Sequence, residues 1–192
     1  MPTPNPAALD FLLTRRSRPA KTLMPPIPDR ATVETLLTAA ARTPDHGKLE
    51  PWRFVVLEKP ALQRLAAAVS PRGAELGLDA DKTSKMADQF ARADLAIAVV
   101  AAPKPSEKIP EIEQVLSAGA VCLALLNAAL AAGWGANWLS GWASHDRPFI
   151  ETHLGLARHE TVAGFIHLGT ETNAPPERPR PDIADITTWV AS

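Results

Sequence analysis

Apolar residues recur at helical spacing in two segments near the start of the chain. The first segment places Ala8, Leu9, Leu12 and Leu13 on one helical face. It ends at Arg15-Arg16-Ser17. The second begins at Asp29, a residue type favoured as an N-cap, and is predicted to end near Arg42. Its apolar positions follow at i, i+3, i+4, i+7 and i+8: Val33, Leu36, Leu37, Ala40 and Ala41.

Runs rich in aliphatic, aromatic and β-branched residues predict the strands. Residues 52–57, 136–139 and 161–168 have this composition. Residues 95–102 form a continuous apolar run of strand length, which indicates a strand covered on both faces. A helix is predicted from Pro60 to about Val69, between the first two strands. The alternation favours an α+β fold in which a central mixed sheet is flanked by helices.

The longest apolar segment is a predicted helix over residues 111–132. From Val115 onward it is apolar on most of its circumference, as is typical of a helix buried in a core or an interface. It carries more apolar surface than one layer needs, so dimerisation would cover the excess. Asn127, Asn137 and several glycines interrupt the stretch, which we therefore interpret as a core helix and a following strand, not a membrane span.

Three other segments are less regular. Asp146 is predicted to cap a helix, whereas the proline-rich residues 170–182 predict an irregular connection to a short segment at 186–190. Residues 71–85 are polar and contain two glycines, which predicts a mobile surface region. This region and residues 103–110 could line a substrate pocket.

Length and charge limit the function classes. The 192 residues, 46% of them hydrophobic, are expected to form one domain over 1–192. A net charge of −1 gives no field to attract nucleic acid or a membrane surface, so neither is an expected partner. Cys122 is the sole cysteine and cannot form an internal disulfide. This and the absence of an apolar signal region at the N-terminus predict a cytoplasmic location.

Several common chemistries have no signature in the chain. The sequence has no G-x-G-x-x-G, no Walker A motif and no H-E-x-x-H, and its histidines lack metal-ligand spacing. A Rossmann site and a metal site are therefore not expected. Ser17, Ser140 and Cys122 lack the context of a catalytic nucleophile, and Cys122 is interpreted as a small buried residue.

Two clusters of charged residues remain. Arg15-Arg16-Ser17 can be surface cations favoured by a helix C-terminus, or a phosphate site in which guanidinium groups and a hydroxyl bind oxygens. The segment 41–54 contains Arg42, Asp45, His46, Gly47 and Lys48 between two apolar elements. It can be a plain connection, or a loop that contacts a polar ligand.

A third cluster is aromatic and glycine-rich. Residues 133–142 hold three tryptophans and three glycines. They can serve packing alone, or they can form a wall where the backbone approaches a flat ring.

Together these motifs resemble the nitroreductase family, and within it a subgroup with a Pro-Asp-His loop. The resemblance spans Leu9 to about Asp182. The motifs in order are the early R-R-S, the block A-R-x-P-D-H…P-W-x-F, the helix with Ser117-Ala118-Gly119, the segment W-x-S-G and the closing strand G-F-x-x-L-G.

The resemblance implies an α+β sandwich that forms an intimate homodimer with tightly bound FMN at the subunit interface. Arg15 and Ser17, with Arg16 beside them, would bind the FMN phosphate or ribityl end, and Arg178 or, preferably, Arg180 would close this site. Arg42 and His46 match flavin-contacting positions. The segment that would lie along the isoalloxazine ring comprises Trp138, Leu139, Ser140 and Gly141.

The implied chemistry belongs to the flavin, and no side chain is assigned as catalytic. NAD(P)H would deliver hydride to flavin N5 and leave, after which a nitroaromatic, a quinone or a similar electron-poor acceptor would react at the same face in ping-pong turnover. His46 or Arg42 would stabilise the reduced flavin near N1 and O2.

Three positions depart from the family pattern. Glu50 replaces a glutamine, Leu139 stands where the subgroup often has arginine, and Pro19 falls near a usual lysine that Lys21 could replace. These departures leave open a flavin-dependent dehydrogenase or ene-type reductase with a dedicated metabolite, and a low-turnover flavin-binding or redox-sensing protein. A purely structural dimer is the remaining alternative.

Overall fold

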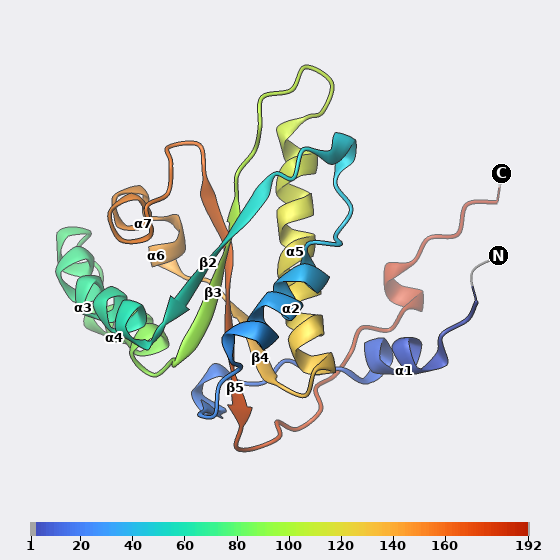
Figure 1. Cartoon of the computed structure of the whole chain (residues 1–192), viewed down its shortest axis with the longest axis horizontal. Helices are drawn as coiled ribbons and strands as arrows, with labels where there is room; N and C mark the ends of the chain where they lie inside the picture. The colour runs from blue at the N-terminus through green and yellow to red at the C-terminus, as the bar shows by residue number, and fades with distance from the viewer. Residues whose placement is uncertain (1–2, 192) are drawn as a thin grey trace.

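The computed structural model describes residues 3–191, which form an antiparallel sheet with helices on both faces (Figure 1). The helices are α1 (Pro6–Thr14), α2 (Arg30–Ala40), α3 (Lys59–Glu75), α4 (Ala80–Ala91), α5 (Glu111–Ala131), α6 (Trp142–His145) and α7 (Arg147–Leu154). The strands are β1 (Leu23–Met24), β2 (Trp52–Glu58), β3 (Leu95–Ala101), β4 (Gly135–Leu139) and β5 (Thr161–Glu171). Three short 3₁₀ turns are η1 (Ala20–Thr22), η2 (His46–Lys48) and η3 (Ala184–Ile186).

The strand order is β1-β5-β3-β2, and β4 also pairs with β5. Every pairing in the described chain is antiparallel, so the predicted mixed sheet was wrong for one copy of the chain. The eleven residues of β5 are long enough to pair with β3 along one edge and with β4 and then β1 along the other. Strand β2 has a partner on one side only, so its other edge is free within one copy.

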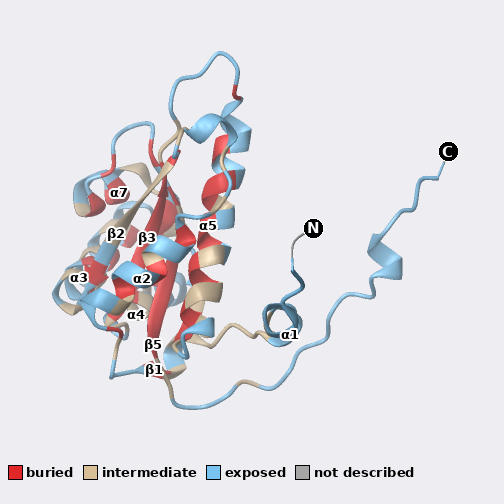
Figure 2. Ribbon diagram, turned by 45° about the vertical axis from the view of Figure 1, so that its right-hand side comes forward, coloured by how far each residue is buried: buried red, intermediate tan, exposed pale blue. Residues whose placement is uncertain are grey.

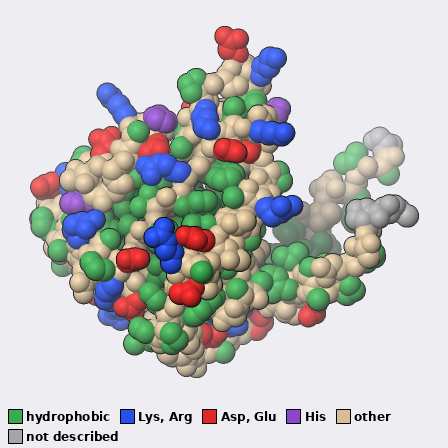
Figure 3. All heavy atoms as spheres, viewed as in Figure 1, with side chains coloured by type: hydrophobic (Ala, Val, Ile, Leu, Met, Phe, Trp, Pro, Cys, Tyr) green, Lys and Arg blue, Asp and Glu red, His purple; other side chains and the backbone are tan. Residues whose placement is uncertain are grey.

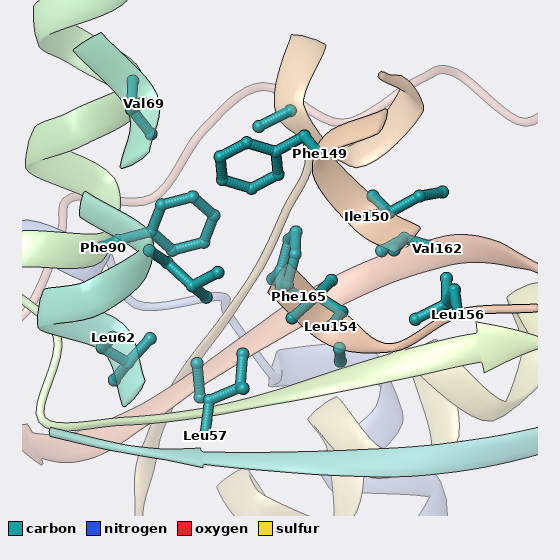
Figure 4. Packing of buried hydrophobic residues seen from close by; sticks show 14 of the residues in the cluster. Leu57, Leu62, Val69, Phe90, Phe149, Ile150, Leu154, Leu156, Val162 and Phe165 are labelled. Atoms are coloured by element: carbon teal, nitrogen blue, oxygen red, sulfur yellow. The ribbon is translucent and has the colours of Figure 1, made fainter. Parts of the chain in front are cut away.

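Two apolar clusters cover the two faces of the sheet. On β3, the side chains of Ala96, Ala98 and Val100 join the cluster under α3, α4, α6 and α7, which includes the stacked and edge-packed rings of Phe90, Phe149 and Phe165 (Figure 4). The alternate residues of β3 join the cluster under α2 and α5. All seven residues of β3 are buried (Figure 2), which confirms the prediction of a strand covered on both faces.

Residues 71–85 were expected to be a mobile surface region, and this expectation was wrong. Helix α3 continues through Pro71 to Glu75, and α4 begins at Ala80. A Cβ atom at Gly73 would lie 2.7 Å from Oγ1 of Thr83, so this glycine lets the two helices approach closely. The polar residues that suggested a loop occupy the exposed sides of two amphipathic helices.

Helix α5 packs one side against β3, β4, β5 and α2 and leaves another side uncovered. It is long and apolar enough to cross a membrane, but core helices of globular proteins have the same composition, and its packing identifies it as one. Its exposed large apolar residues are Ile112, Val115, Leu116 and Leu123. On the buried side, Cys122 is fully covered, and burial raises the pKa of its thiol to about 12.

Both terminal segments extend away from the sheet and helices (Figures 1 and 2). They carry large apolar side chains in solvent: Leu9, Leu12 and Leu13 on α1, and Ile183, Ile186, Trp189 and Val190 near the C-terminus. A further apolar surface is a hollow of about 700 Å³ between α2 and the free edge of β2, which is visible in Figure 3. One copy of the chain therefore leaves much apolar surface uncovered.

Asp146 joins two of the helices on the α3/α7 face. As predicted, it caps a helix: its carboxylate accepts a hydrogen bond from the amide of Phe149, at 3.0 Å. The same carboxylate accepts from Nε and Nη2 of Arg72, at 2.8 and 2.9 Å. These bonds to Arg72 are the main cause of a lowered pKa at Asp146.

We expect Asp146→Asn to lower the free energy of unfolding by about 1–3 kcal/mol near neutral pH, because asparagine still caps the helix but cannot pair with Arg72 as an anion. The folded pKa of Asp146 lies below its unfolded value of about 3.9. The carboxylate's contribution is therefore present above that value and lost as pH falls through the folded pKa. Urea unfolding should show that the difference in the free energy of unfolding between the variant and wild type is smaller near pH 3 than at pH 7. Asp10→Asn, at an exposed position on α1, is the control, and a difference independent of pH would contradict the prediction.

Candidate functional site

The residues Arg15, Arg16 and Ser17 follow α1 and lie beside β4. Nη2 of Arg15 donates to Oγ of Ser17 at 2.9 Å. The next residue fixes the segment to the sheet, because the amide of Arg18 donates to the carbonyl of Ala136 at 2.8 Å. The segment and the Gly133–Gly135 turn line a hollow of about 290 Å³. The first and third sequence clusters thus come together.

This hollow, the Arg15 site, carries unsatisfied hydrogen-bond donors. The Nε atoms of Arg15 and Arg16 are buried, and neither has a hydrogen-bond partner in the described chain. The pKa of Arg15 is lowered by burial first and then by the nearby charges of Arg180, Arg16 and Arg18. Such crowding of like charges with unused donors fits an anion with several oxygen atoms.

The two C-terminal arginines differ in their relation to the Arg15 site. Arg180 is near enough to influence Arg15 electrostatically, and its Nη2 donates to Glu177 at 2.9 Å. Arg178 is exposed, and its backbone amide also donates to Glu177, whereas its side chain makes no hydrogen bond or ion pair within residues 3–191. Of the two, Arg180 is the arginine whose charge reaches the Arg15 site, and its role there stays a prediction.

The W-x-S-G segment lies at the end of β4, next to α4 and β5. The ring of Trp138 packs over Gly164, where a side chain would collide with it. Gly141 is equally constrained, because a Cβ atom there would lie 2.8 Å from Sδ of Met86. Ser140 is exposed, and Leu139 faces a neighbouring cavity. The two glycines thus allow close packing around the end of β4, where Ser140 remains exposed.

The cavity beside Leu139, the Leu139 pocket, has a volume of about 330 Å³. Its walls include Lys21, Gln89 and His167. The side chain of His167 is buried, and burial lowers its pKa to about 4, so the imidazole is neutral at pH 7. Nε2 of Gln89 and Nε2 of His167 are both buried with no hydrogen-bond partner among the described residues. The pocket therefore offers polar groups to a ligand.

Sequence reasoning missed Gln89 and His167. His167 did give a signal, since it is the one polar ring in an otherwise apolar predicted strand. Gln89 gave none, because it lies on a helix that was not predicted. Lys21, which was considered as a substitute for the family lysine, does line the pocket. The segment of residues 15–21 therefore links the Arg15 site to the Leu139 pocket.

The loop with Arg42 and His46 lies elsewhere, at the start of α5. Nδ1 of His46 is 2.7 Å from Oε2 of Glu113. Ser117 holds the base of the loop: its hydroxyl donates to the carbonyl of Pro44 at 2.9 Å and accepts from Nε1 of Trp52 at 3.2 Å. Arg42 is exposed, and its side chain makes no hydrogen bond or ion pair within residues 3–191.

The structure therefore does not bring all the predicted site residues together within one copy. The hollow at Arg15 is lined by Leu130 near the end of α5, whereas His46 contacts Glu113 near its start (Figure 1). Leu130 follows Glu113 by 17 positions along the helix, a rise of about 25 Å at 1.5 Å per residue. Across the described ranges, no three His, Cys, Asp or Glu side chains are grouped for metal binding.

The model of the Nitroreductase family matches residues 12–170, which include β1–β4, helices α2–α7 and all of β5 but its last residue. The chain belongs to the nitroreductase family.

Curated relatives of this nitroreductase-family chain share about a third of its residues. It is 35% identical over 163 residues to "Putative NAD(P)H nitroreductase YdjA" of Escherichia coli (strain K12), covering 85% of this chain and 87% of that protein. It is 35% identical over 165 residues to "Putative NAD(P)H nitroreductase" of Haemophilus influenzae, covering 85% and 88%.

Solved structures share the fold at lower identity. The Nitroreductase-like Family Protein from Bacillus cereus has a TM-score of 0.79 and 22% identity, with 99% of this chain and 98% of that chain covered. A structure from Desulfovibrio desulfuricans, described as a putative nitroreductase in complex with FMN, has a TM-score of 0.73 and 21% identity, with 98% and 99% covered. The expected α+β fold is confirmed.

Proposed function

We propose that this chain is an FMN-dependent oxidoreductase that takes electrons from NAD(P)H and passes them to nitroaromatics, quinones or similar electron-poor acceptors. The observation that carries the proposal is the segment of residues 15–21, which links a hollow with unused arginine donors to a pocket with unused polar donors. FMN has two matching parts, because its phosphate is joined by a flexible linker to a flat polar ring. The phosphate would suit the arginine hollow, and the ring would suit the pocket. Relatives named NAD(P)H nitroreductases and a related fold in complex with FMN support the choice.

The residues present fit FMN in three respects. The buried Nε atoms of Arg15 and Arg16 are unused donors suited to phosphate oxygens. Ser140 at the end of β4 is exposed, next to Leu139 in the wall of the pocket, so this end of the strand can meet a ligand. The Gln89 amide and the His167 imidazole offer hydrogen-bonding groups in the adjacent pocket.

Each proposed role is assigned by chemistry. Arg15, Arg16, Ser17 and Arg180 would hold the phosphate, and Arg178 would contribute only long-range charge. Trp138, Leu139, Ser140 and Gly141 would lie along the ring. When bound, FMN supplies the two-electron redox chemistry. The protein positions the ring and stabilises negative charge on it, and we assign part of that charge stabilisation to Arg42 and His46.

We further propose that the active form is a homodimer in which two copies complete each site. Arg15 and His46 lie near opposite ends of α5, so one flavin can meet both only if they belong to different copies. A twofold arrangement with antiparallel α5 helices would bring them together. It would also cover the exposed apolar side of α5, and the terminal segments and the hollow beside β2 offer further surface.

The proposed acceptor class is general, and the dedicated-metabolite reductase remains the second candidate. Leu139 favours it, because this residue gives the pocket an apolar wall where the subgroup often has arginine. We propose ping-pong turnover, because donor and acceptor would react at the same face of the flavin. From the chain length we propose one FMN-binding domain over residues 1–192. From the single cysteine and the lack of an apolar signal region we propose a cytoplasmic location.

Purified protein should be yellow, and NADPH or NADH added without oxygen should bleach the flavin absorbance near 450 nm, as expected for a flavoprotein reductase. Addition of a quinone or a nitroaromatic should restore the absorbance. Colourless protein that does not bind added FMN would reject every flavin function. Bound FMN that neither nucleotide reduces would favour the low-turnover flavin-binding protein instead.

A further inference from the structure

A hollow of about 820 Å³ lies at the end of the sheet opposite the Arg15 site. It is bounded by residues 102–110, which follow β3, and by residues 155–160, which precede β5. Its volume is in the range of small-molecule sites. We call it the Lys104 hollow. Neither the sequence motifs nor the proposed flavin site uses it.

One wall of the Lys104 hollow is fixed by a buried amide. Gln114, only 4% exposed, accepts a hydrogen bond from the amide of Lys104 at 2.8 Å and donates to the carbonyl of the same residue at 3.0 Å. Because both backbone groups of Lys104 are held, its side chain leaves from a fixed point. Pro103 and Pro105 stiffen the chain on either side and add apolar surface.

The opposite wall is fixed by a second set of hydrogen bonds. Arg147 donates to the carbonyl oxygens of Ala157 and Glu160, at 3.2 and 2.8 Å. The carboxylate of Glu160 accepts from the amide of Ala157 and from two nitrogens of Arg53. Arg158 therefore lies on a braced turn at the edge of the hollow.

The charges around the hollow are unbalanced toward positive. The side chains of Lys104 and Arg158 make no ion pair or hydrogen bond with any residue from 3 to 191. Arg147 has a partial partner in Glu151, at 3.6 Å. The one carboxylate in the lining belongs to Glu111. Two unused cations on rigid supports, next to apolar prolines, fit an organic anion.

The Lys104 hollow shares a wall with the His46 loop. Ile109 lines the hollow, and its Cδ1 would lie 2.5 Å from a Cβ atom at Gly47, so side chain and loop are in close contact. Gly47 also has a positive φ of 71°, which favours glycine. Since the proposed dimer places the His46 loop at a flavin, the hollow would lie beside that flavin and not under its ring.

We propose that the Lys104 hollow binds the 2′-phosphorylated adenosine end of NADPH while the nicotinamide reaches the flavin past His46. This inference rests on the proposed function, and it names the preferred donor. A phosphate monoester would meet Lys104 and Arg158, and the adenine would contact Pro103, Pro105 and Ile109. NADH lacks that phosphate, so NADPH is the better donor.

The kinetic test uses FMN-loaded protein and measures flavin reduction by stopped flow without oxygen. Arg158→Ala and Lys104→Ala should each raise the apparent Kd for NADPH about tenfold or more, because each removes a charge-assisted contact. The apparent Kd for NADH and the limiting reduction rate should stay within about twofold of wild type. Arg64→Ala, an exposed arginine on α3, is the charge-matched control.

A direct binding test does not depend on turnover. Adenosine 2′,5′-bisphosphate should bind FMN-loaded wild type more tightly than adenosine 5′-monophosphate, and Arg158→Ala should abolish the difference. If neither nucleotide reduces the wild-type flavin, the proposed function fails, but this titration still tests the hollow.

Three results would overturn the inference: an unchanged NADPH affinity in both variants, an equal loss for NADPH and NADH, or equal binding of the two adenosine probes by wild type. A defect confined to reoxidation by 4-nitrobenzoate, with nitrobenzene unaffected, would also overturn it and would assign the hollow to an anionic acceptor.

Discussion

Arg15→Ala is expected to weaken FMN binding by about 1.5–3 kcal/mol, or roughly tenfold to more than a hundredfold in Kd, because a charge-assisted contact to phosphate is lost. The buried Nε of Arg15 has no partner in the described chain, so its loss should cost ligand affinity without breaking an internal hydrogen bond at that atom. The measurement is a titration of apoprotein with FMN, followed by quenching of flavin fluorescence.

Arg64→Ala is the matched control, since Arg64 is an exposed arginine on α3 and lines neither the Arg15 site nor the hollow beside β2. Arg180→Ala should have a smaller effect than Arg15→Ala, because the Arg180 side chain is 52% exposed and screened by solvent. An Arg15→Ala protein that folds and keeps wild-type FMN affinity would reject the phosphate role.

The second large effect is complementation between two inactive variants. If each site takes Arg15 from one copy and His46 from the other, a heterodimer of Arg15→Ala and His46→Ala subunits has one site with both residues and one with neither. Random pairing should then restore about a quarter of wild-type NADPH-dependent turnover, even where each variant alone is nearly inactive.

Two tags of different sequence allow the mixed dimer to be isolated, and it should show about half of the wild-type activity with one tightly bound FMN for two chains. Arg15→Ala mixed with Arg16→Ala is the control, because both changes fall in the same half-site and no intact site can form. Mixed dimers no more active than the better parent would contradict the shared site.

The fold was predictable wherever burial leaves a periodic or continuous apolar pattern. Strand β3 is apolar because it is covered on both faces, and helix α5 is apolar where it packs against the sheet; both were located within a few residues. The two residues of β1 carry no period of their own and are ordered by pairing with the end of β5. Helix α4 was missed because only Met86 and Phe90 of its twelve residues are buried, and its charged residues dominate the sequence.

The candidate site was predictable where chemistry is local in sequence. Arg15-Arg16-Ser17 and the W-x-S-G segment were identified from the sequence, and the structure places the first near the start of β4 and the second at its end. Gln89 and His167 come from α4 and β5 and meet only through tertiary packing. His46 lies at the other end of α5 from Arg15. This separation depends on tertiary contacts, which cannot be predicted from a single sequence.

Two of the three departures from the family pattern, Glu50 and Leu139, have different structural settings. Glu50 is exposed in the loop before β2 with a positive φ of 48°, and its amide is bonded to Asp45, so its side chain projects from a strained backbone. Leu139 lines the pocket beside the proposed flavin. Of these two, only Leu139 lines that pocket, so it is the one that would bear on the proposed substrate.

The burial of Cys122 makes the natural chain a ready background for site-directed labelling. Its thiol is covered by α5 and the sheet, and its raised pKa keeps it protonated at neutral pH, where thiol reagents need the thiolate. A single cysteine introduced at an exposed position would thus be modified selectively, without first replacing Cys122. A nitroxide attached in this way to each copy would report the distance between two α5 helices by double electron–electron resonance.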